Sequence, residues 1–238
     1  ASFFPNAKMA GLLMNAEIEN AKKVLHKAER PFTAIVGGAK VSDKVLIVEN
    51  LLQIANHIII GGGMAYTFFK AMGGQIGASL CEAERVDTCK EILARAKTMG
   101  VQIHLPIDAV VADCFAADAN TKIANSGEIE ANWMGLDIGP KAIETFRAVL
   151  LESKTILWNG PMGVFEMPAF ENGTKSIAHA VADATKNGAF SLIGGGDSAA
   201  AVQQFELSKE VSYVSTGGGA LLEYFEGKTL PGVEALEA

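Results

Sequence analysis

This sequence has few cysteines, no long apolar run and no excess of positive charge. Its 3 cysteines, Cys81, Cys89 and Cys114, are odd in number and form no C-x-x-C pair, which argues against a disulfide framework and a zinc site. No apolar run approaches the ~18 residues of a membrane-spanning helix. Lys and Arg number 20 against 27 Asp and Glu, a net charge of −7 without a basic stripe, which disfavours a nucleic-acid binder.

Apolar residues are abundant instead. They make up 49% of the 238 residues and charged residues only 20%, which excludes a disordered chain. Short apolar runs recur, and most are apolar at every position, which is typical of strands buried on both sides of a parallel sheet. The runs are Phe32–Val36, His57–Ile60, Val101–Leu105, Thr155–Trp158, Ala189–Ile193 and Val211–Val214.

Segments with helical spacing of apolar residues lie between these runs. They are Val41–Ala55, Glu82–Met99, Pro140–Leu151 and Phe170–Lys186. Such alternation predicts right-handed βαβ units. We therefore expect an α/β fold of three layers: a doubly wound, Rossmann-like, mainly parallel six-stranded sheet with helices on both faces.

Two stretches depart from this alternation. Met14–Glu29 has the pattern of a helix that precedes the first strand. Val110–Met134 contains turn-like residues and predicts a hairpin or excursion from the sheet. Asp108 and Asp113, near its start, are interpreted as turn and surface residues.

Glycine follows five of the predicted strands directly or within three residues. The segments are Gly37–Gly38, Gly61–Gly63, Asn159–Gly160, Gly194–Gly196 and Ser215–Gly219. Ligands bind at the carboxyl edge of open α/β sheets, where glycine lets the backbone approach closely and frees amides at helix N-termini. One such turn would serve packing alone, whereas five on one edge favour a nucleotide or phosphate site.

The residues around these glycines show which known phosphate-binding motifs the sequence matches and which it does not. Gly37–Lys44 does not fit the P-loop pattern. Gly194–Ala199 formally fits the dinucleotide fingerprint, but the next strand ends at Ser215–Thr216 without the acid that would bind a ribose. Asp197 would repel a bare pyrophosphate and is instead suited to Mg²⁺ bound to phosphates. Asp197 could also cap a helix at Ser198–Phe205, and both roles can hold together.

Two lysines and one glutamate are further candidates. Lys40 and Lys44 lie four residues apart around the start of the predicted Val41–Ala55 helix, a spacing that places them near one face. Lysines there oppose the helix dipole, so a functional role explains them better than a solvated pair. Glu166 lies near the same sheet edge, where its carboxylate could accept from two ribose hydroxyls.

Taken together, these residues resemble the phosphoglycerate kinases. The matching stretches are PFTAIVGGAKVSDK (31–44), IIIGGGMAYTFFKA (58–71), WMGLDIGP (133–140), ILWNGPMGVFE (156–166), GGGDSAAA (194–201) and VSTGGGALLEYFEGKTLPGVEAL (214–236). Their order and spacing run through the whole chain, and WNGPMGVFE and STGGGALLEYFEGK are long and specific.

The resemblance implies a glycolytic phosphotransferase. Its reaction is reversible transfer between 1,3-bisphosphoglycerate and Mg-ADP, giving 3-phosphoglycerate and ATP. Residues 31–238 correspond to the ADP/ATP-binding domain, and residues 1–30 to the segment and interdomain helix that lead from an N-terminal domain missing here. That domain would bind the phosphoglycerate, so this chain is expected to be inactive alone. A cytoplasmic monomer without nucleic-acid or membrane partners is also expected.

The resemblance also implies a role for each matching residue. Lys40 meets the α-phosphate, Lys44 follows the transferred phosphoryl group, Glu166 holds the ribose and Asp197 binds Mg²⁺. Lys44, Gly196 and Gly219 are the expected catalytic positions. The expected nucleotide-binding positions are Gly37, Gly38, Ala39, Lys40, Lys44, Gly61, Gly62, Leu80, Gly135, Leu136, Asn159, Pro161, Val164, Glu166, Gly195, Gly196, Asp197 and Ser198. The family often has threonine at the position of Ser198, and serine keeps the hydroxyl.

Two other functions remain open at this point. One is a Rossmann-like enzyme that uses NAD or FAD, which the missing ribose acid disfavours. The other is a non-catalytic interaction module that keeps only the fold, which the presence of Lys44, Glu166 and Asp197 disfavours.

Overall fold

The computed structural model describes residues 9–237. Its centre is a parallel sheet of six strands in the order β11-β10-β9-β1-β2-β4. These strands are β1 Phe32–Val36, β2 His57–Ile60, β4 Gln102–His104, β9 Thr155–Asn159, β10 Phe190–Gly194 and β11 Tyr213–Val214. Every apolar run expected to form a strand lies in this one sheet. β1 and β9 are buried at every position, as their unbroken apolar sequences predict.

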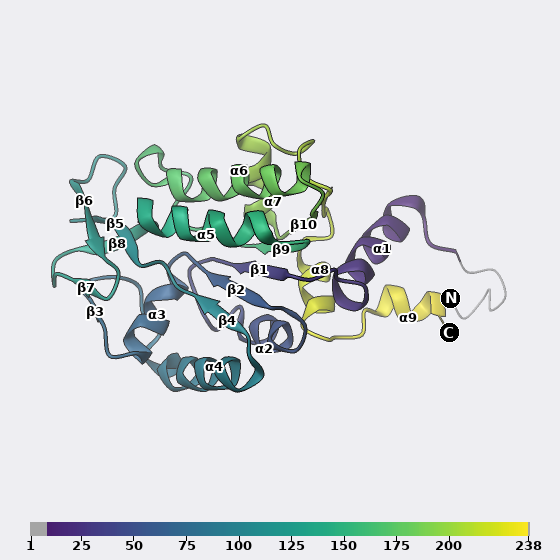
Figure 1. Cartoon of the computed structure of the whole chain (residues 1–238), viewed down its shortest axis with the longest axis horizontal. Coiled ribbons are helices and arrows are strands. Elements are labelled where there is room, and N and C mark those ends of the chain that lie inside the picture. The colour runs from purple at the N-terminus through teal and green to yellow at the C-terminus, as the bar shows by residue number, and fades with distance from the viewer. Residues whose placement is uncertain (1–8, 238) are drawn as a thin grey trace.

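Helices cover both faces of the sheet, and the predicted three-layer α/β class is confirmed (Figure 1). One face carries α5 Pro140–Glu152, α6 Asn172–Lys186 and α7 Gly196–Gln204. The other carries α2 Val45–Ile54, α3 Met64–Ala71 and α4 Val86–Met99. A separate apolar core fills the space on each side: Phe32 and Phe68 lie in one, and Phe146 and Trp158 in the other. No described helix has the length and apolar character needed to span a membrane.

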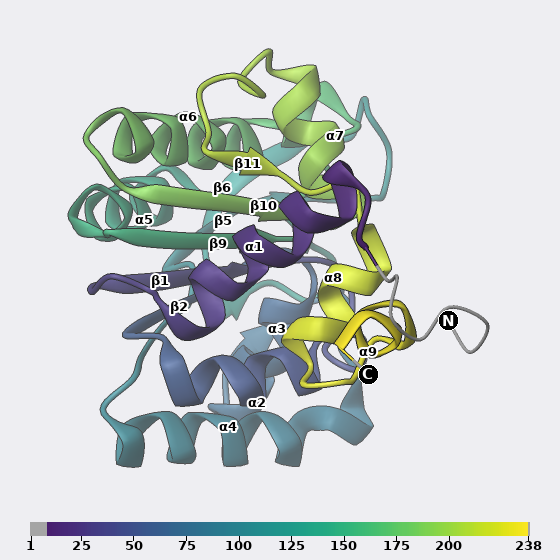
Figure 2. The same ribbon diagram turned by 90° about the vertical axis from the view of Figure 1, so that its right-hand side faces the viewer.

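The helix expected ahead of the first strand is α1, Leu12–His26. It runs across the strands and lies beside α8 Gly218–Phe225, with α9 Pro231–Glu237 close by (Figure 2). Its residues Ala21 and Val24 are buried in the same core as α2 and α8. The division of the chain at residues 30 and 31 stays a prediction.

The expected excursion forms a second, antiparallel sheet. β5 Asp108–Ala112 pairs with both β6 Thr121–Asn125 and β8 Met134–Ile138. The short strands β3 Gln75–Ile76 and β7 Glu128–Ile129 pair beside it. This sheet brings β8 next to the carboxyl edge of the main sheet, where it forms one wall of the site described below.

The interpretation of Asp108 as a surface or turn residue is wrong. Its side chain is buried, and its carboxylate accepts hydrogen bonds from the backbone N–H groups of Lys141 (3.1 Å) and Ala142 (2.8 Å) at the start of α5. Helix N-termini leave such groups unpaired, and a carboxylate there also suits the helix dipole. Asp113 is indeed exposed and binds Asn120 across a turn.

The helix after β1 begins later than its sequence predicts. Residues 41–44 form a turn closed by Lys44 N–H and the Val41 carbonyl at 2.8 Å, and α2 starts at Val45. The Glu82 carboxylate accepts from the Ser42 N–H (3.0 Å) and hydroxyl (2.6 Å), which holds this turn outside the helix. Lys44 is therefore the residue just before the helix, and Lys40 lies in the loop. The prediction that both lysines share one helical face is wrong.

Candidate functional site

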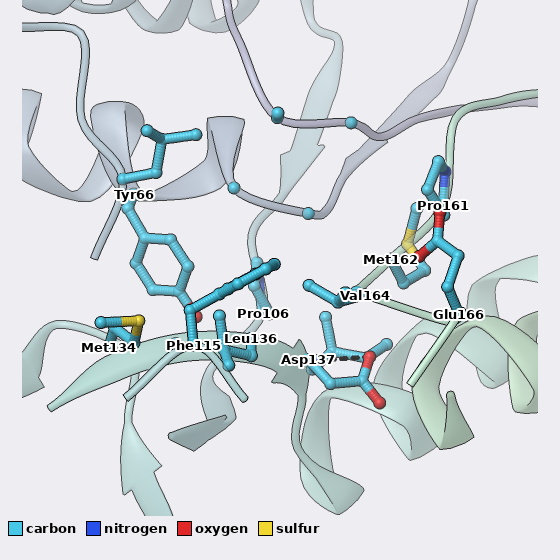
Figure 3. Close-up of a pocket in the computed structure, with 18 of the residues that line it drawn as sticks. Tyr66, Pro106, Phe115, Met134, Leu136, Asp137, Pro161, Met162, Val164 and Glu166 are labelled. Atoms are coloured by element: carbon cyan, nitrogen blue, oxygen red, sulfur yellow. Dashed lines mark hydrogen bonds between the residues drawn. The ribbon is translucent and has the colours of Figure 1, made fainter. Parts of the chain in front are cut away.

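A cavity of about 480 Å³ opens where the carboxyl edge of the main sheet faces β8. Its wall on the main-sheet side consists of the loops after β1, β2 and β9, and its opposite wall is β8 (Figure 3). Many of the predicted binding residues line it together: Gly38, Ala39, Gly62, Leu80, Gly135, Leu136, Pro161, Val164, Glu166 and Asp197. Most of the cavity is apolar, which suits a flat ring system.

Several residues that line the cavity have no role in the sequence-based prediction. They are Gly63, Tyr66, Ala78, Pro106, Phe115, Met134, Asp137, Ile138, Met162 and Gly163. Phe115 is 60% exposed and projects from the loop between β5 and β6 over the opening (Figure 3). Burial, followed by the nearby Asp137 carboxyl, raises the pKa of the Tyr66 hydroxyl well above its usual range, so Tyr66 is neutral. Two of these lining residues carried a usable signal: Gly63 belongs to the glycine run Gly61–Gly63, and Asp137 is a lone acid between Leu136 and Ile138.

Other predicted residues lie beneath the cavity surface rather than on it. Gly37, Gly61, Asn159 and Ser198 are buried. Gly37 N–H donates to the Asn159 carbonyl at 2.8 Å, which continues the pairing of β1 and β9. The Ser198 hydroxyl accepts from Gly160 N–H at 2.6 Å and joins α7 to the turn after β9. In this arrangement its side chain supports the site from behind.

The polar end of the site is the start of α7. Gly195 precedes the helix with φ +89°, and a Cβ at this residue would lie 2.6 Å from Asn159 Nδ2, so only glycine fits there. Asp197 lies exposed in the first turn of α7, and no side chain caps this helix. The alternative role of Asp197 as an N-cap is therefore wrong, while the helix N-terminus itself favours an anion.

Lys44 lies at the same end, half-buried before α2. Its ammonium group donates to Asn159 Oδ1, and Asn159 Nδ2 in turn donates to the Gly194 carbonyl at 2.8 Å. Burial lowers the pKa of Lys44, and the charges of Asp197, Asp43 and Glu226 offset part of this effect. A cation held by one neutral amide is available for an anion that enters beside it. Lys40 is exposed and does not line the cavity.

A second glycine-rich helix start lies at the opposite side of this edge. Gly217–Gly219 does open a helix, α8, as predicted, but Gly219 is exposed and outside the cavity. The segment ahead of it is held by Glu17 of α1, which no sequence motif indicated. The Glu17 carboxylate accepts from the Ser215 hydroxyl (2.6 Å) and from the Thr216 N–H (2.8 Å) and hydroxyl (2.9 Å). Burial raises its pKa, but these hydrogen bonds outweigh burial and lower it overall.

The acids of the cavity also bear on metal binding. Among residues 9–237, no three His, Cys, Asp or Glu side chains come together to hold a metal by themselves. Asp197 alone faces the cavity from α7 and is exposed. Mg²⁺ commonly takes one or two carboxylates and completes its shell with phosphate oxygens and water. The donor set therefore fits an Mg²⁺ that arrives with a phosphorylated ligand and does not fit a permanent metal centre.

Comparisons with known proteins agree on one family. Residues 1–228 match the profile of the family described as phosphoglycerate kinase. The chain is 55% identical over 230 residues to the phosphoglycerate kinase of Porphyromonas gingivalis (strain ATCC BAA-308 / W83), a match that covers 97% of this chain and 55% of that protein.

Solved structures give the same result. The structure of phosphoglycerate kinase from Coxiella burnetii superposes with a TM-score of 0.92 at 43% identity, covering 96% of this chain and 58% of that one. Phosphoglycerate kinase from Pyrococcus horikoshii OT3 gives a TM-score of 0.82 at 31% identity, covering 95% and 56%. The chain thus spans little more than half the length of these relatives.

Proposed function

The chain belongs to the phosphoglycerate kinase family, and from this premise we propose that it is the half of such an enzyme that binds ADP and ATP. The reaction is phosphoryl transfer between 1,3-bisphosphoglycerate and Mg-ADP, which gives 3-phosphoglycerate and ATP. One observation carries the proposal: a single cavity has apolar walls at one end and the α7 N-terminus, with Asp197, at the other. Adenosine matches the first end and phosphates match the second.

The apolar end is suited to the base and ribose. Leu80, Leu136 and Val164 offer flat apolar surface to an adenine ring. Glu166, exposed at the rim of the same cavity, would accept hydrogen bonds from the two ribose hydroxyls. Base and ribose are thereby fixed, and the phosphates extend toward α7.

The polar end would supply positive potential for the transferring group. Phosphoryl transfer passes through a loose transition state in which charge is spread over equatorial oxygens, so catalysis rests on positioning and fixed positive charge. The free N–H groups at the start of α7, around Gly196, would receive the β-phosphate. Lys44 would release Asn159 and donate to the transferred group, while Lys40 would approach the α-phosphate. The ADP β-phosphate is itself an anionic nucleophile, so this chain needs to provide no general base.

Mg²⁺ bound between Asp197 and the nucleotide phosphates would neutralise part of their charge. This matters because the chain carries a net charge of −7 and repels a free anion. Asp197, Asp43 and Glu226 add local negative charge around Lys44. Binding of the nucleotide is therefore expected to depend strongly on the metal.

The phosphoglycerate would bind outside the nucleotide half. The chain spans 55% of the length of its relative from Porphyromonas gingivalis, and the nucleotide proposed here would occupy the cavity. The 238-residue chain is therefore expected to bind nucleotide without completing turnover. Gly219, at the start of α8, would face the transferring group only when the phosphoglycerate is brought to it. Cytoplasmic location and a monomeric state also stay predictions, and gel filtration measures the second.

Calorimetric titration of Mg-ADP into the 238-residue chain tests the proposal. Saturable binding is expected, with affinity lost when Mg²⁺ is chelated. Asp197→Ala is expected to weaken binding roughly tenfold and to remove most of its dependence on Mg²⁺. Asp87→Ala is the matched control, because Asp87 is likewise an exposed acid in the first turn of a helix, α4.

Each alternative has its own outcome in this experiment. A folded chain that binds no nucleotide would overturn the proposal and favour an interaction module. Binding of NAD or FAD in preference to Mg-ADP would favour the dinucleotide enzyme. An equal effect of Asp87→Ala and Asp197→Ala would show that Asp197 acts only on the stability of its helix.

A further inference from the structure

Asp137 is a buried acid in the cavity wall to which the proposed reaction assigns no role. It lies in β8 between Leu136 and Ile138, and its side chain is only 3% exposed. A buried carboxyl group is costly unless the protein satisfies it. Burial raises its pKa to about 7, even though backbone hydrogen bonds from Gly173 and Ile138 act in the opposite direction. The contacts of the Asp137 carboxyl group show which elements of the fold it connects.

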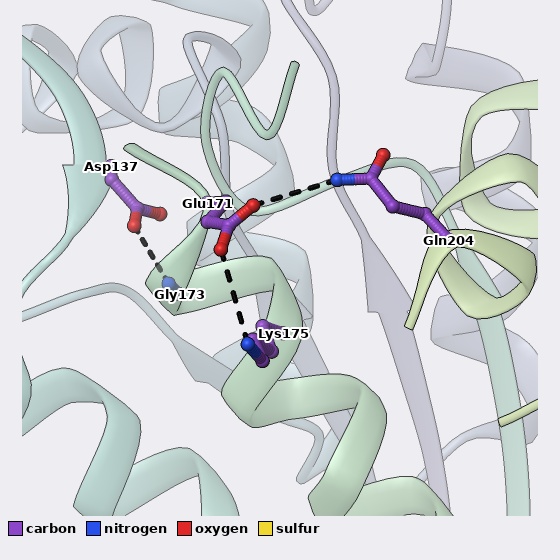
Figure 4. A network of polar contacts seen from close by, with 5 residues as sticks. All are labelled: Asp137, Glu171, Gly173, Lys175 and Gln204. Atoms are coloured by element: carbon purple, nitrogen blue, oxygen red, sulfur yellow. Dashed lines mark hydrogen bonds and ion pairs between the residues drawn. The ribbon is translucent and has the colours of Figure 1, made fainter. Parts of the chain in front are cut away.

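Asp137, which lies in strand β8, caps the N-terminus of helix α6. α6 begins at Asn172, and no side chain of its preceding residue caps it. Oδ2 of Asp137 instead accepts a hydrogen bond of 2.7 Å from Gly173 N–H, in the first turn of α6 (Figure 4). The positive end of the helix dipole favours a carboxylate at this place. One side chain thus ties β8 to the start of α6.

The loop that carries Glu166 closes over the same carboxyl group. A Cβ at Gly163 would lie 2.7 Å from both Cα and Cγ of Asp137, and one at Gly173 would lie 2.8 Å from Cγ. Both glycine backbones therefore press directly on Asp137, and no space is left for a shift of the carboxyl group. Gly163 itself belongs to the wall opposite β8.

Two hydrogen bonds join that loop to the elements that Asp137 ties together. Val164 N–H donates to the Leu136 carbonyl of β8 at 2.9 Å. Met162 N–H donates to the hydroxyl of Thr174, in the first turn of α6, at 3.0 Å, and Thr174 is fully buried. The start of α6 therefore holds one wall through Thr174 and the other through Asp137.

The remaining polar contacts near this helix start are weaker. Glu171 meets Gln204 at 3.5 Å and Lys175 at 3.9 Å, and both contacts lie at the surface (Figure 4). Exposed contacts of this length contribute little to a fixed geometry. The contact of Asp137 with Gly173, in contrast, is a buried connection between β8 and α6.

We infer that Asp137 is a positioning residue, which ties β8 to α6 and so sets the separation of the two cavity walls that enclose base and ribose. This inference rests on the proposed function. It predicts that the nucleoside part of the ligand loses affinity when the tie is weakened, while the gain from adding phosphates is kept.

The experiment compares adenosine with Mg-ADP in wild-type chain and in Asp137→Asn, which keeps the shape and one acceptor oxygen but removes the charge. Calorimetry gives the affinity for Mg-ADP, and competition with Mg-ADP gives that for adenosine. Both are expected to fall by roughly tenfold in Asp137→Asn, so that their ratio stays constant. Thr174→Val loosens the same helix start from the other wall and is expected to lower both by a smaller factor.

Ile177→Ala is the matched control for stability. Ile177 is fully buried in α6, three residues after Thr174, in the core on that face of the sheet. Its truncation costs stability without touching Asp137, and both affinities are expected to stay within about twofold of wild type.

The outcomes separate cleanly. A folded Asp137→Asn variant with wild-type affinity for adenosine would overturn the inference, as would an equal loss in an Ile177→Ala variant of similar thermal stability. A wild-type chain that binds no Mg-ADP would instead overturn the proposed function, and the inference with it.

Discussion

The two ends of the cavity are built in opposite ways. At the apolar end, the walls are fixed by buried polar ties, such as the Ser79 hydroxyl, which accepts from Gly135 N–H at 2.9 Å, and Asp137. At the polar end, Gly196 and Asp197 are exposed and Lys44 is half-buried. Asn159 joins Lys44 to the Gly194 carbonyl that precedes α7. The first end is thus defined by shape and the second by charge.

This contrast explains how an acidic chain can bind an anionic ligand. Apolar burial is insensitive to the net charge of −7, so the nucleoside can anchor the ligand despite it. The phosphates then need only local positive potential, which a helix N-terminus, one lysine and a metal provide. If this division holds, substitutions at the polar end will lower the affinity for Mg-ADP alone, and substitutions at the apolar end will lower the affinities for adenosine and Mg-ADP by the same factor.

Gly195→Ala is expected to break the phosphate end with the largest effect. The new Cβ would meet Asn159 Nδ2 in a backbone conformation with φ +89°, so the start of α7 must shift. Affinity for Mg-ADP should fall by about 100-fold, since several charge-assisted hydrogen bonds are lost together, while adenosine affinity changes by less than about threefold. Calorimetry measures both.

Gly188→Ala controls for the strained backbone. Gly188 has φ +97° and open space around it, so alanine there adds strain without a collision. It should lower thermal stability and leave both affinities unchanged. Equal losses of adenosine and Mg-ADP in Gly195→Ala would contradict the division between the ends.

Lys44→Met is expected to have the next largest effect, roughly 10- to 100-fold on Mg-ADP and none on adenosine, because a charge-assisted hydrogen bond is removed. Burial lowers the pKa of Lys44 from the ordinary 10.5, so the ammonium loses its proton at a lower pH than a free lysine does. Affinity of the wild-type chain for Mg-ADP should therefore decline with rising pH before 10.5 is reached. Lys44→Arg should remove that decline, and a decline that persists in Lys44→Arg would assign it to another group.

Asp137, at the apolar end, should make the free energy of unfolding of the chain depend on pH. The raised pKa of Asp137, about 7 against an ordinary 3.8, means that the folded chain keeps a proton which the unfolded chain releases. This contribution to stability is complete below pH ~4 and is lost as pH rises through about 7. Asp137→Asn lacks this titration, so its stability relative to wild type should improve by roughly 1–3 kcal/mol between pH 5 and pH 8. Urea unfolding at the two pH values measures the difference.

Asp183→Asn provides the comparison, since Asp183 is a surface acid paired with Arg147 at 2.9 Å. Such pairs are worth about 0–1 kcal/mol. A relative stability of Asp137→Asn that stays constant from pH 5 to pH 8 would show that Asp137 does not titrate in the folded chain within this range.

The sequence predicted the polar end better than the apolar end, for a physical reason. Glycines after strands and acids or lysines beside them are local signals, so Gly195, Lys44 and Asp197 were found at once. The apolar walls depend on packing between distant segments: Tyr66 and Phe115 line the same cavity only because the second sheet folds onto the carboxyl edge of the first. Most strands of the main sheet were predicted to within a residue or two because unbroken apolar runs are typical of a parallel sheet, whereas the strands of the second sheet were predicted only as a hairpin or excursion.

The errors have the same origin. Asp108 and the turn of residues 41–44 were misinterpreted because their partners, the start of α5 and Glu82, lie far away in the chain. The place of Ser198 in the helix N-terminus that would meet the phosphate stays a prediction, but its hydrogen bond with Gly160 had no signal in the sequence for the same reason. The sequence shows that such a polar residue is present, but its hydrogen-bond partner is known only once the fold is known.

Glu166 lies between the two ends and gives the smallest and most selective test. It is exposed at the cavity rim, and hydrogen bonds to an exposed carboxylate are worth little, so Glu166→Gln should lower affinity for Mg-ADP by only about threefold. The decisive measurement is a thermodynamic cycle that compares ADP and its 2′-deoxy analogue in the wild-type chain and in Glu166→Gln. Removal of the 2′-hydroxyl should weaken binding to the wild-type chain and have almost no further effect on Glu166→Gln. If the hydroxyl matters equally in both chains, Glu166 does not hold the ribose, and the boundary between shape and charge must then be drawn at the α-phosphate rather than at the sugar.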